Sequence, residues 1–253
     1  MRLAITQPNF LPWMGYFELL DYVDVWVSLD NVQLSRGSFV HRNRVRQPNG
    51  SVEWISASIP KRCPLHTLIK DAPISKNGWQ ERIARKLESY YERAPFYDQF
   101  GARVTELLLS TARVESLAAL NESLIHELSS WLGITYQFYK ASDLVTTLEG
   151  SPQDKVLTLV RRFDADTYCN FAGGIEAGLY DASAFLQEGV ILEKQVYEHP
   201  IYPQHGGGFE PFLSILDLLY ETGAQALEIV CSGRSWQRML PGHTVPDDQS
   251  KLA

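Results

Sequence analysis

The first thirty residues constrain the fold most, because strand, loop, helix and strand signals follow one another there. Residues 2–6 form a short apolar run, and residues 24–29 form a second run rich in β-branched and aromatic side chains. Between them lie a loop with two prolines and an apolar-periodic stretch over residues 16–22. This order predicts a βαβ unit with parallel strands and a right-handed crossover. We therefore expect an α/β protein with a mostly parallel, Rossmann-like sheet.

The rest of the chain predicts an added hairpin and a helical middle segment. Residues 39–47 and 52–59 are typical of two strands, because the Asn-Gly pair at 49–50 favours a tight turn between them. Helix signals dominate residues 77–132, where Asn77 is the expected first cap. Helices are also expected from Ser151 and Ser214, the latter ending near Gly223, and strands over residues 134–140, 166–171 and 189–195. These signals indicate one domain over residues 1–240 and a frayed tail over residues 241–253.

Composition excludes several functional classes. The formal net charge is −7, which argues against a nucleic-acid partner, since such proteins usually carry a basic excess. Prolines and acids interrupt the apolar N-terminal thirty residues, so neither a signal peptide nor a membrane span is predicted, and a cytoplasmic location is expected. The three cysteines, Cys63, Cys169 and Cys231, are widely spaced, which favours free thiols over disulfides or a zinc site.

A basic segment follows the second predicted strand. Residues 31–62 contain six Arg or Lys residues and one acid, giving a local charge of +5 in an acidic chain. On a strand, Arg42, Arg44 and Arg46 would share one face at about 7 Å spacing. Rigid guanidinium forks in a row suit a diphosphate. The alternative is a solvated hairpin face with the arginines paired to acids elsewhere.

Two other segments of the N-terminal half are candidate site elements. Residues 7–16, with Gln7, Trp13 and Tyr16, follow the first strand, where they either form a pocket wall that stacks a base or sugar or simply pack the core. Asp30 ends the second strand, at the edge where open α/β sheets bind ligands. It is a candidate base or hydroxyl-binding carboxylate, although Asp is also a common turn residue there.

The third candidate segment, residues 199–209, contains two histidines and three consecutive glycines. Its glycines allow the backbone to approach a ligand closely, and His199 is a candidate general base; the alternative is a surface loop without chemistry. The spacing of His199 and His205 matches no common zinc pattern, so no metal site is predicted, and the sequence identifies no cofactor. Ser214 and Asp217 fit a helix capping box.

Three stretches of the chain carry a combined motif. They are Ile5-Thr6-Gln7-Pro8 through Pro12-Trp13-Met14-Gly15-Tyr16-Phe17, then Asp30-Asn31-Val32-Gln33 with Arg36 and Arg42-Asn43-Arg44, and finally His199-Pro200-Ile201-Tyr202-Pro203-Gln204 with Phe209, residues 213–219 and Gly223. Together they resemble the WbqC-like protein family. The resemblance covers most of the chain, to about residue 225, and is specific only in combination. The segment before Arg42 departs from the family, since it lacks the usual tryptophan, which leaves the role of His41 open.

The resemblance implies a role in bacterial O-antigen or other polysaccharide biosynthesis, where some similar proteins are described as glycyl or acyl transferases acting on amino sugars. The expected partner is a small-molecule nucleotide sugar; the oligomeric state is not indicated. The hypothesis is amide formation on such a sugar, with His199 or Asp30 as base. Expected substrate-binding residues are Gln7, Trp13, Tyr16, Arg36, Arg42, Asn43, Arg44, Tyr202 and Gln204.

Two alternatives belong to different classes. An ATP-consuming, nucleotidyltransferase-like enzyme would also open with a strand, a Pro-rich loop and a helix. However, residues 13–16 stand where its HxGH signature would be. The other alternative is a non-catalytic sugar-binding partner of a polysaccharide assembly complex.

Overall fold

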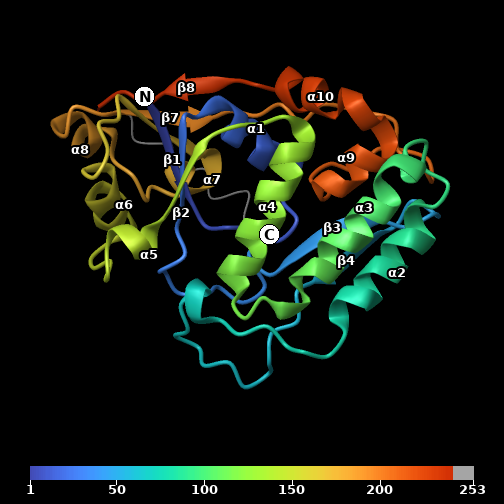
Figure 1. Cartoon of the computed structure of the whole chain (residues 1–253). Helices are drawn as coiled ribbons and strands as arrows, with labels where there is room; N and C mark the ends of the chain where they lie inside the picture. The colour runs from blue at the N-terminus through green and yellow to red at the C-terminus, as the bar shows by residue number, and fades with distance from the viewer. Residues whose placement is uncertain (242–253) are drawn as a thin grey trace.

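The computed structural model describes residues 1–241, in which six strands form one sheet in the order β5-β2-β1-β6-β7-β8 (Figure 1). Five of these strands run parallel, and β8 pairs antiparallel with β7 at the edge. The predicted α/β class with a mostly parallel sheet is confirmed. The strands are β1 (Arg2–Thr6), β2 (Val25–Ser28), β5 (Gln137–Lys140), β6 (Thr167–Phe171), β7 (Ile191–Gln195) and β8 (Trp236–Arg238).

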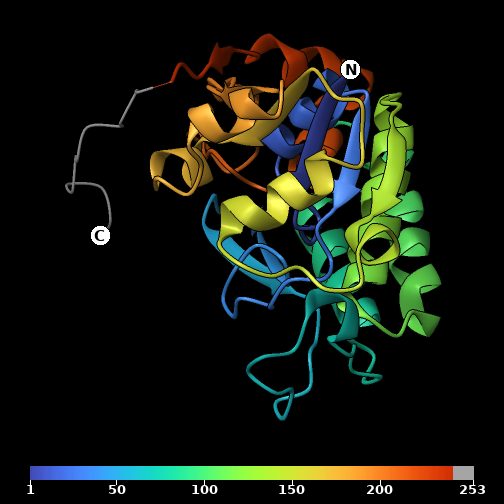
Figure 2. The ribbon, with the colours of Figure 1, turned by 90° about the vertical axis from the view of Figure 1, so that its left-hand side faces the viewer.

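Helices cover both faces of the sheet, which explains why its central strands are buried and largely apolar. Ala4 and Trp26 pack on the side of α1 (Met14–Tyr22) and α4 (Leu117–Leu132). Leu3, Ile5, Val25 and Val27 point the other way, because side chains alternate along a strand. They pack against α6 (Pro152–Val160) and α8 (Ala182–Gln187). Figure 2 shows α6, in yellow, and α4, in green, on opposite sides of the blue strands.

The chain reverses direction across the sheet between β1 and β6. From β1 it proceeds outward to β2 and β5, and then returns to place β6 and β7 on the other side of β1. Numbered in chain order, this is the 3-2-1-4-5-6 arrangement of doubly wound folds with an antiparallel last strand. Such sheets bind ligands outside the carboxyl ends of their strands. Both views place the N-terminus at the top, so this edge faces downward, toward the hairpin and the loops below it (Figures 1 and 2).

The added hairpin is also confirmed, as a separate two-stranded sheet of β3 (Arg42–Arg46) and β4 (Val52–Ser56). Gly50 closes its turn with a φ of +85°, a conformation that glycine adopts without strain. Both strands are shorter than the expected 39–47 and 52–59. The N–H of His41 donates to the Ser38 carbonyl, so residues 38–41 form a turn rather than part of the ladder.

The helical middle consists of α2 (Trp79–Tyr91), α3 (Tyr97–Ser110) and α4. The prediction of Asn77 as the first cap was wrong. Gly78 occupies that position with a φ of +67°, and the Asn77 amide donates to Ser58 Oγ at 3.2 Å. Farther along, Ser151 and Asp154 form the capping box that begins α6.

The last part of the chain contains more structure than expected. The predicted final helix is α9 (Ile215–Thr222), but α10 (Ala226–Ser232) and β8 follow it. Short 3-10 turns lie over Ile69–Asp71, Thr111–Arg113 and Gly223–Gln225, and the short helices α5 (Ala141–Leu144) and α7 (Ala172–Glu176) border the sheet. Apart from Pro241, the expected tail over residues 241–253 lies outside the described residues. Among residues 1–241, the helices lack the combined length and apolar character that a bilayer crossing requires.

Candidate functional site

Strand β3 connects two segments that lie far apart in the chain, the loop after β1 and the segment before α9. Asn43 is fully buried, and its Nδ2 donates to the carbonyls of Phe10 (3.3 Å) and Leu11 (2.7 Å). On the other side, Arg44 forms an ion pair with Glu210 at 2.9 Å. The three stretches that carry the resemblance therefore meet at this strand.

The contacts of β3 hold two strained loop residues in place. Within the described chain, the non-glycine residues with positive φ are Leu11 (44°) and Phe212 (59°). Such a backbone costs about 1–3 kcal/mol and persists only when its surroundings hold it. Asn43 holds the Leu11 carbonyl, and Arg44 Nη2 donates to the Phe212 carbonyl at 3.4 Å and to that of Pro211 at 2.8 Å. The Asn43-Arg44 pair thus fixes the shape of both loops.

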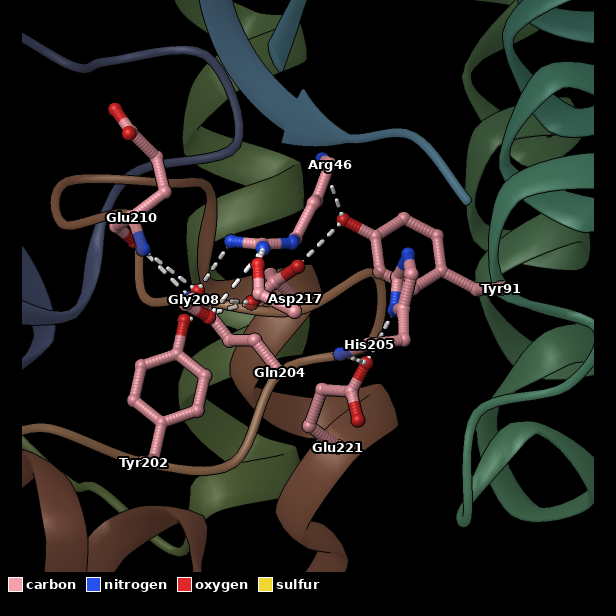
Figure 3. A network of polar contacts seen from close by, with 10 residues as sticks. Arg46, Tyr91, Tyr202, Gln204, His205, Gly208, Glu210, Asp217 and Glu221 are labelled. Atoms are coloured by element: carbon pink, nitrogen blue, oxygen red, sulfur yellow. Dashed lines mark hydrogen bonds and ion pairs between the residues drawn. The ribbon is translucent and has the colours of Figure 1, made fainter. Parts of the chain in front are cut away.

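Arg46 is enclosed by the protein, with only 2% of its surface exposed (Figure 3). Its Nη1 donates to Gln204 Oε1 at 2.8 Å, and its Nη2 donates to the carbonyls of Gly207 and Gly208. Within residues 1–241, no carboxylate forms an ion pair with this guanidinium, so dipoles of neutral groups solvate its charge. The expectation that Arg42, Arg44 and Arg46 form one open face does not hold at Arg46.

The three glycines at 206–208 have a packing role. All three have positive φ, of 78°, 77° and 69°, so the segment curls around the Arg46 guanidinium. A Cβ on Gly206 would lie 2.4 Å from the backbone nitrogen of Gly50, which forbids any side chain there. The glycine run therefore seats this segment on the hairpin turn.

Asp217 is the centre of a buried network beneath Arg46 (Figure 3). Its carboxylate accepts hydrogen bonds from the hydroxyls of Tyr91 (2.8 Å) and Tyr202 (2.7 Å) and from Gln204 Nε2 (3.0 Å). Burial raises the pKa of Asp217, while the Tyr202 and Tyr91 donors oppose that rise. The predicted capping box with Ser214 was wrong, because the tyrosines recruit the carboxylate and the Ser214 N–H donates to the carbonyl of Arg44.

The predicted N-terminal residues pack beside this network. Tyr16 is fully buried, and its hydroxyl bonds with Thr6 Oγ1 and the Gln7 carbonyl, each at 3.0 Å. Trp13 is half-buried, and a Cβ on Gly15 would lie 2.1 Å from its ring. Residues 13–16 therefore hold an indole and a buried phenol where a nucleotidyltransferase signature would hold histidines.

The two predicted bases are hydrogen-bonded by the protein itself. His199 stacks near Trp13, and its Nε2 accepts the Phe212 N–H at 3.1 Å. Asp30 is buried, and its two oxygens accept from the Ser142 N–H (2.9 Å) and hydroxyl (2.6 Å) at the start of α5. The catalytic roles of His199 and Asp30 stay predictions, and the two residues belong to separate surroundings.

A cavity of about 340 Å³ opens at the outer end of the hairpin, and we call it the basic pocket. His41 and Ala57 flank the strand ends there, joined by a backbone hydrogen bond of 2.9 Å. The lining includes three side chains that carry or accept positive charge and no carboxylate. The lining residues are Leu34, Arg36, His41, Ala57, Ser58, Ile59, Pro60, Lys61, Cys63, Pro64 and Leu65.

The cations at this end have no counter-ions in the described part of the chain. Arg36, Arg42 and Lys61 form no ion pair with any carboxylate of residues 1–241. Arg36 Nη2 donates to the Cys63 carbonyl, which orients the guanidinium at the pocket wall. A Cβ on Gly37 would lie 3.5 Å from Arg42 Nη2, so the Arg42 guanidinium lies against the backbone next to Arg36. The two guanidinium groups therefore belong to one positively charged region.

His41 is the imidazole that lines the basic pocket. Burial lowers its pKa, and the charges of Arg42 and Arg36 lower it further. Its imidazole is therefore neutral near pH 7, and its Nδ1 is buried without a hydrogen-bond partner. A neutral imidazole can accept a proton in a site that attracts anions.

The sequence predicted Arg36 and Arg42 here but missed Lys61 and Ser58, and it left His41 open. Lys61 contributed to the local positive charge, which is the one signal that pointed to it. The pocket wall over residues 57–65 is a loop without apolar periodicity, so no pattern indicates which of its side chains meet the strand end.

Comparisons with known proteins agree with the three stretches that meet at β3. A curated relative, "Uncharacterized protein Rv1507c" from Mycobacterium tuberculosis (strain ATCC 25618 / H37Rv), is 28% identical over 226 residues, which cover 89% of this chain and 95% of the relative. No solved structure matches the chain. The sequence model of the WbqC-like protein family matches residues 7–229, from the loop after β1 to α10, and the chain belongs to that family.

Proposed function

We propose that this protein is a transferase that forms an amide on a nucleotide-linked amino sugar whose phosphates bind in the basic pocket. The observation that carries the proposal is the pocket lining itself, with Arg36, His41 and Lys61 and without a carboxylate. In a chain of net charge −7, such a lining favours an anionic ligand over a cationic one. The volume of about 340 Å³ is within the range of small-molecule sites.

The pocket residues supply groups that suit a diphosphate. The Arg36 guanidinium is held by the Cys63 carbonyl through one nitrogen, which leaves its other N–H groups for phosphate oxygens. Lys61 adds a flexible point charge, and Ser58 adds a hydroxyl donor. The family resemblance supports the amino-sugar substrate, since similar proteins are associated with polysaccharide biosynthesis.

In the proposed reaction the sugar amine attacks the carbonyl carbon of an acyl or aminoacyl donor. The new C–N bond forms as the bond from carbon to the leaving group breaks, and the amine loses one proton. We assign that proton to His41, because its lowered pKa keeps the imidazole neutral and ready to accept it. His199 and Asp30 are weaker candidates, because both are hydrogen-bonded within the protein.

Binding is tested by calorimetry with a uridine-diphosphate amino sugar on the whole chain. The double variant Arg36→Ala/Lys61→Ala should bind it at least about tenfold more weakly, since two phosphate contacts are lost. The matched control is Lys76→Ala/Arg85→Ala, which removes the same charges from exposed positions outside the pocket. Equal weakening in both double variants would reduce the effect to overall charge and contradict the proposed site.

Catalysis is tested by mass spectrometry of the sugar after incubation with acyl-CoA and activated amino-acid donors. His41→Gln should lower the rate by about 10²–10⁴-fold, with a much smaller change in sugar affinity. Binding without amide formation from any donor would instead favour a sugar-binding partner. Release of AMP or pyrophosphate from ATP would favour the activating enzyme.

A further inference from the structure

Two aromatic side chains lie exposed on the hairpin, Phe39 just before β3 and Trp54 in the middle of β4. Phe39 and Trp54 are each 41% exposed, with ring centroids 5.8 Å apart and planes inclined by 46°. The Arg42 guanidinium lies over the Trp54 ring, 4.2 Å from its centroid. We call these three residues the aromatic platform. Large apolar rings left open beside an arginine are a feature of binding surfaces.

A second Arg–Trp pair in the protein shows what is unusual about the platform. Arg103 lies 4.3 Å from the centroid of the Trp131 ring. There, Glu127 accepts a hydrogen bond from the indole at 2.7 Å, and Glu106 lines the same hollow, so carboxylates accompany the cation. Neither arginine forms an ion pair in residues 1–241, but in the described residues no carboxylate bonds to the Trp54 indole, and the Arg42 Nε is buried without a hydrogen bond. The platform therefore combines a cation and an indole with no carboxylate of the described chain bonded to either.

The platform adjoins the basic pocket. Arg42 follows His41, which lines the pocket, and its guanidinium lies against Gly37, next to Arg36 in the chain. The charges of both arginines act on the His41 ring. A ligand with phosphates in the pocket would therefore present its adjacent group to the platform.

We infer that the aromatic platform binds the nucleobase of the nucleotide-linked substrate by stacking. This inference deepens the proposed function and rests on it. A base offers a flat π-face to the exposed rings, and Arg42 can both stack and attract the neighbouring phosphate. A stacked base is read without hydrogen-bond pairing, so the platform selects nucleotides over free phosphate without a strong preference among bases.

The test is calorimetry on the whole chain with uridine, thymidine, cytidine and guanosine diphosphates, and with inorganic pyrophosphate as the ligand without a base. In Trp54→Leu the Kd for the nucleoside diphosphates should rise by roughly tenfold to a hundredfold, while that for pyrophosphate stays unchanged. Phe39→Leu should show a smaller rise of the same kind. Trp131→Leu is the matched control, and it should change neither Kd.

The outcomes separate the platform from the pocket. If the wild type binds pyrophosphate and nucleoside diphosphates equally and Trp54→Leu changes neither, the platform inference is overturned while the anion pocket stands. If Trp54→Leu weakens nucleotides but Arg36→Ala/Lys61→Ala does not, the platform stands and the proposed phosphate site falls. Equal competition by an oligosaccharide that lacks a base would assign the platform to sugar rings and overturn the inference.

Discussion

The two ends of strand β3 contain the same kind of side chain in opposite surroundings. In the middle of the strand Arg44 pairs with Glu210, and at the inner end Arg46 is enclosed by carbonyls and an amide. At the outer end, Arg42 lies over an exposed indole and Arg36 lines an open pocket, with no ion pair in the described residues. Arg44 and Arg46 therefore support the fold, whereas Arg36 and Arg42 have N–H groups that the described residues leave without acceptors, as the proposed binding role requires.

The inner end should respond most strongly to mutation. Arg46→Met leaves the carbonyls of Gly207 and Gly208 without this donor and Gln204 Oε1 with the Glu210 N–H alone, so the free energy of unfolding should fall by about 3 kcal/mol. Arg42→Met should change it by less than about 1 kcal/mol, since that guanidinium makes no buried hydrogen bond. Urea unfolding of both variants makes the measurement. Similar losses at the two positions would erase the proposed difference between the ends.

Asp217→Asn should have the next largest effect. The amide presents a donor to a site where three donors already converge, so about 2 kcal/mol of stability should be lost. Burial raises the pKa of Asp217 in the folded state, so the carboxyl favours the fold most below its unfolded value of 3.8. That advantage declines as the pH rises through the folded pKa. The free energy of unfolding of the wild type should therefore fall relative to that of Asp217→Asn as the pH rises through this range. A rise would contradict the raised pKa of Asp217.

Phe212→Asn should change the free energy of unfolding less, because one of its two contributions is stabilising. Asn tolerates the left-handed backbone better than Phe, and relief of that strain offsets the loss of the half-exposed ring. The expected change in the free energy of unfolding is within about 1 kcal/mol. Phe209→Asn is the comparison, because Phe209 has no such backbone and packs on Tyr202. In thermal unfolding, the Tm of Phe209→Asn should lie well below that of Phe212→Asn. The reverse order would show that backbone strain at Phe212 does not determine its effect.

The smallest expected effect is the pH dependence that His41 gives to stability and to anion binding at the basic pocket. The folded pKa of His41 lies below its unfolded value of 6.5, so its contribution to stability is present above pH 6.5 and is lost as the pH falls through the folded pKa. An anion in the pocket favours the protonated ring. Pyrophosphate also gains protons as the pH falls, and this affects wild type and His41→Gln alike. The affinity of wild type relative to His41→Gln should therefore rise several-fold as the pH falls below 6.5, which calorimetry of both proteins checks.

Two Ser-x-x-Asp sequences show how far sequence reasoning reached. Ser151 and Asp154 lie on the surface and form the expected capping box. Ser214 and Asp217 have the same spacing, yet Asp217 is buried and bonded to two tyrosines. The local pattern predicts the capping box at Ser151 because only water competes for the exposed Asp154 carboxylate. At Asp217 the tyrosines from other segments take the carboxylate, and the sequence does not show that they lie nearby.

The distinction between local pattern and tertiary partners also applies to the fold and to the candidate site. Apolar runs predicted β1 and β2, because strands buried on both faces leave a continuous signal. They did not predict β8, a three-residue edge strand in which Trp236 is followed by two polar side chains. At the site, the basic run predicted Arg36 and Arg42 as candidates. The partners of Arg44 and Arg46, Glu210 and Gln204, belong to the segment before α9, and no local sequence pattern specifies where that segment lies.

The enclosure of Arg46 has a consequence for biosynthesis. The hairpin leaves the ribosome early, but the amide that receives its guanidinium is 158 positions later in the chain. At about 5–20 residues per second, the hairpin waits roughly 8–30 s for that partner. During this time Arg46 lacks the acceptors that enclose it in the folded protein. The N-terminal third of this protein therefore completes its structure only after most of the chain has been translated.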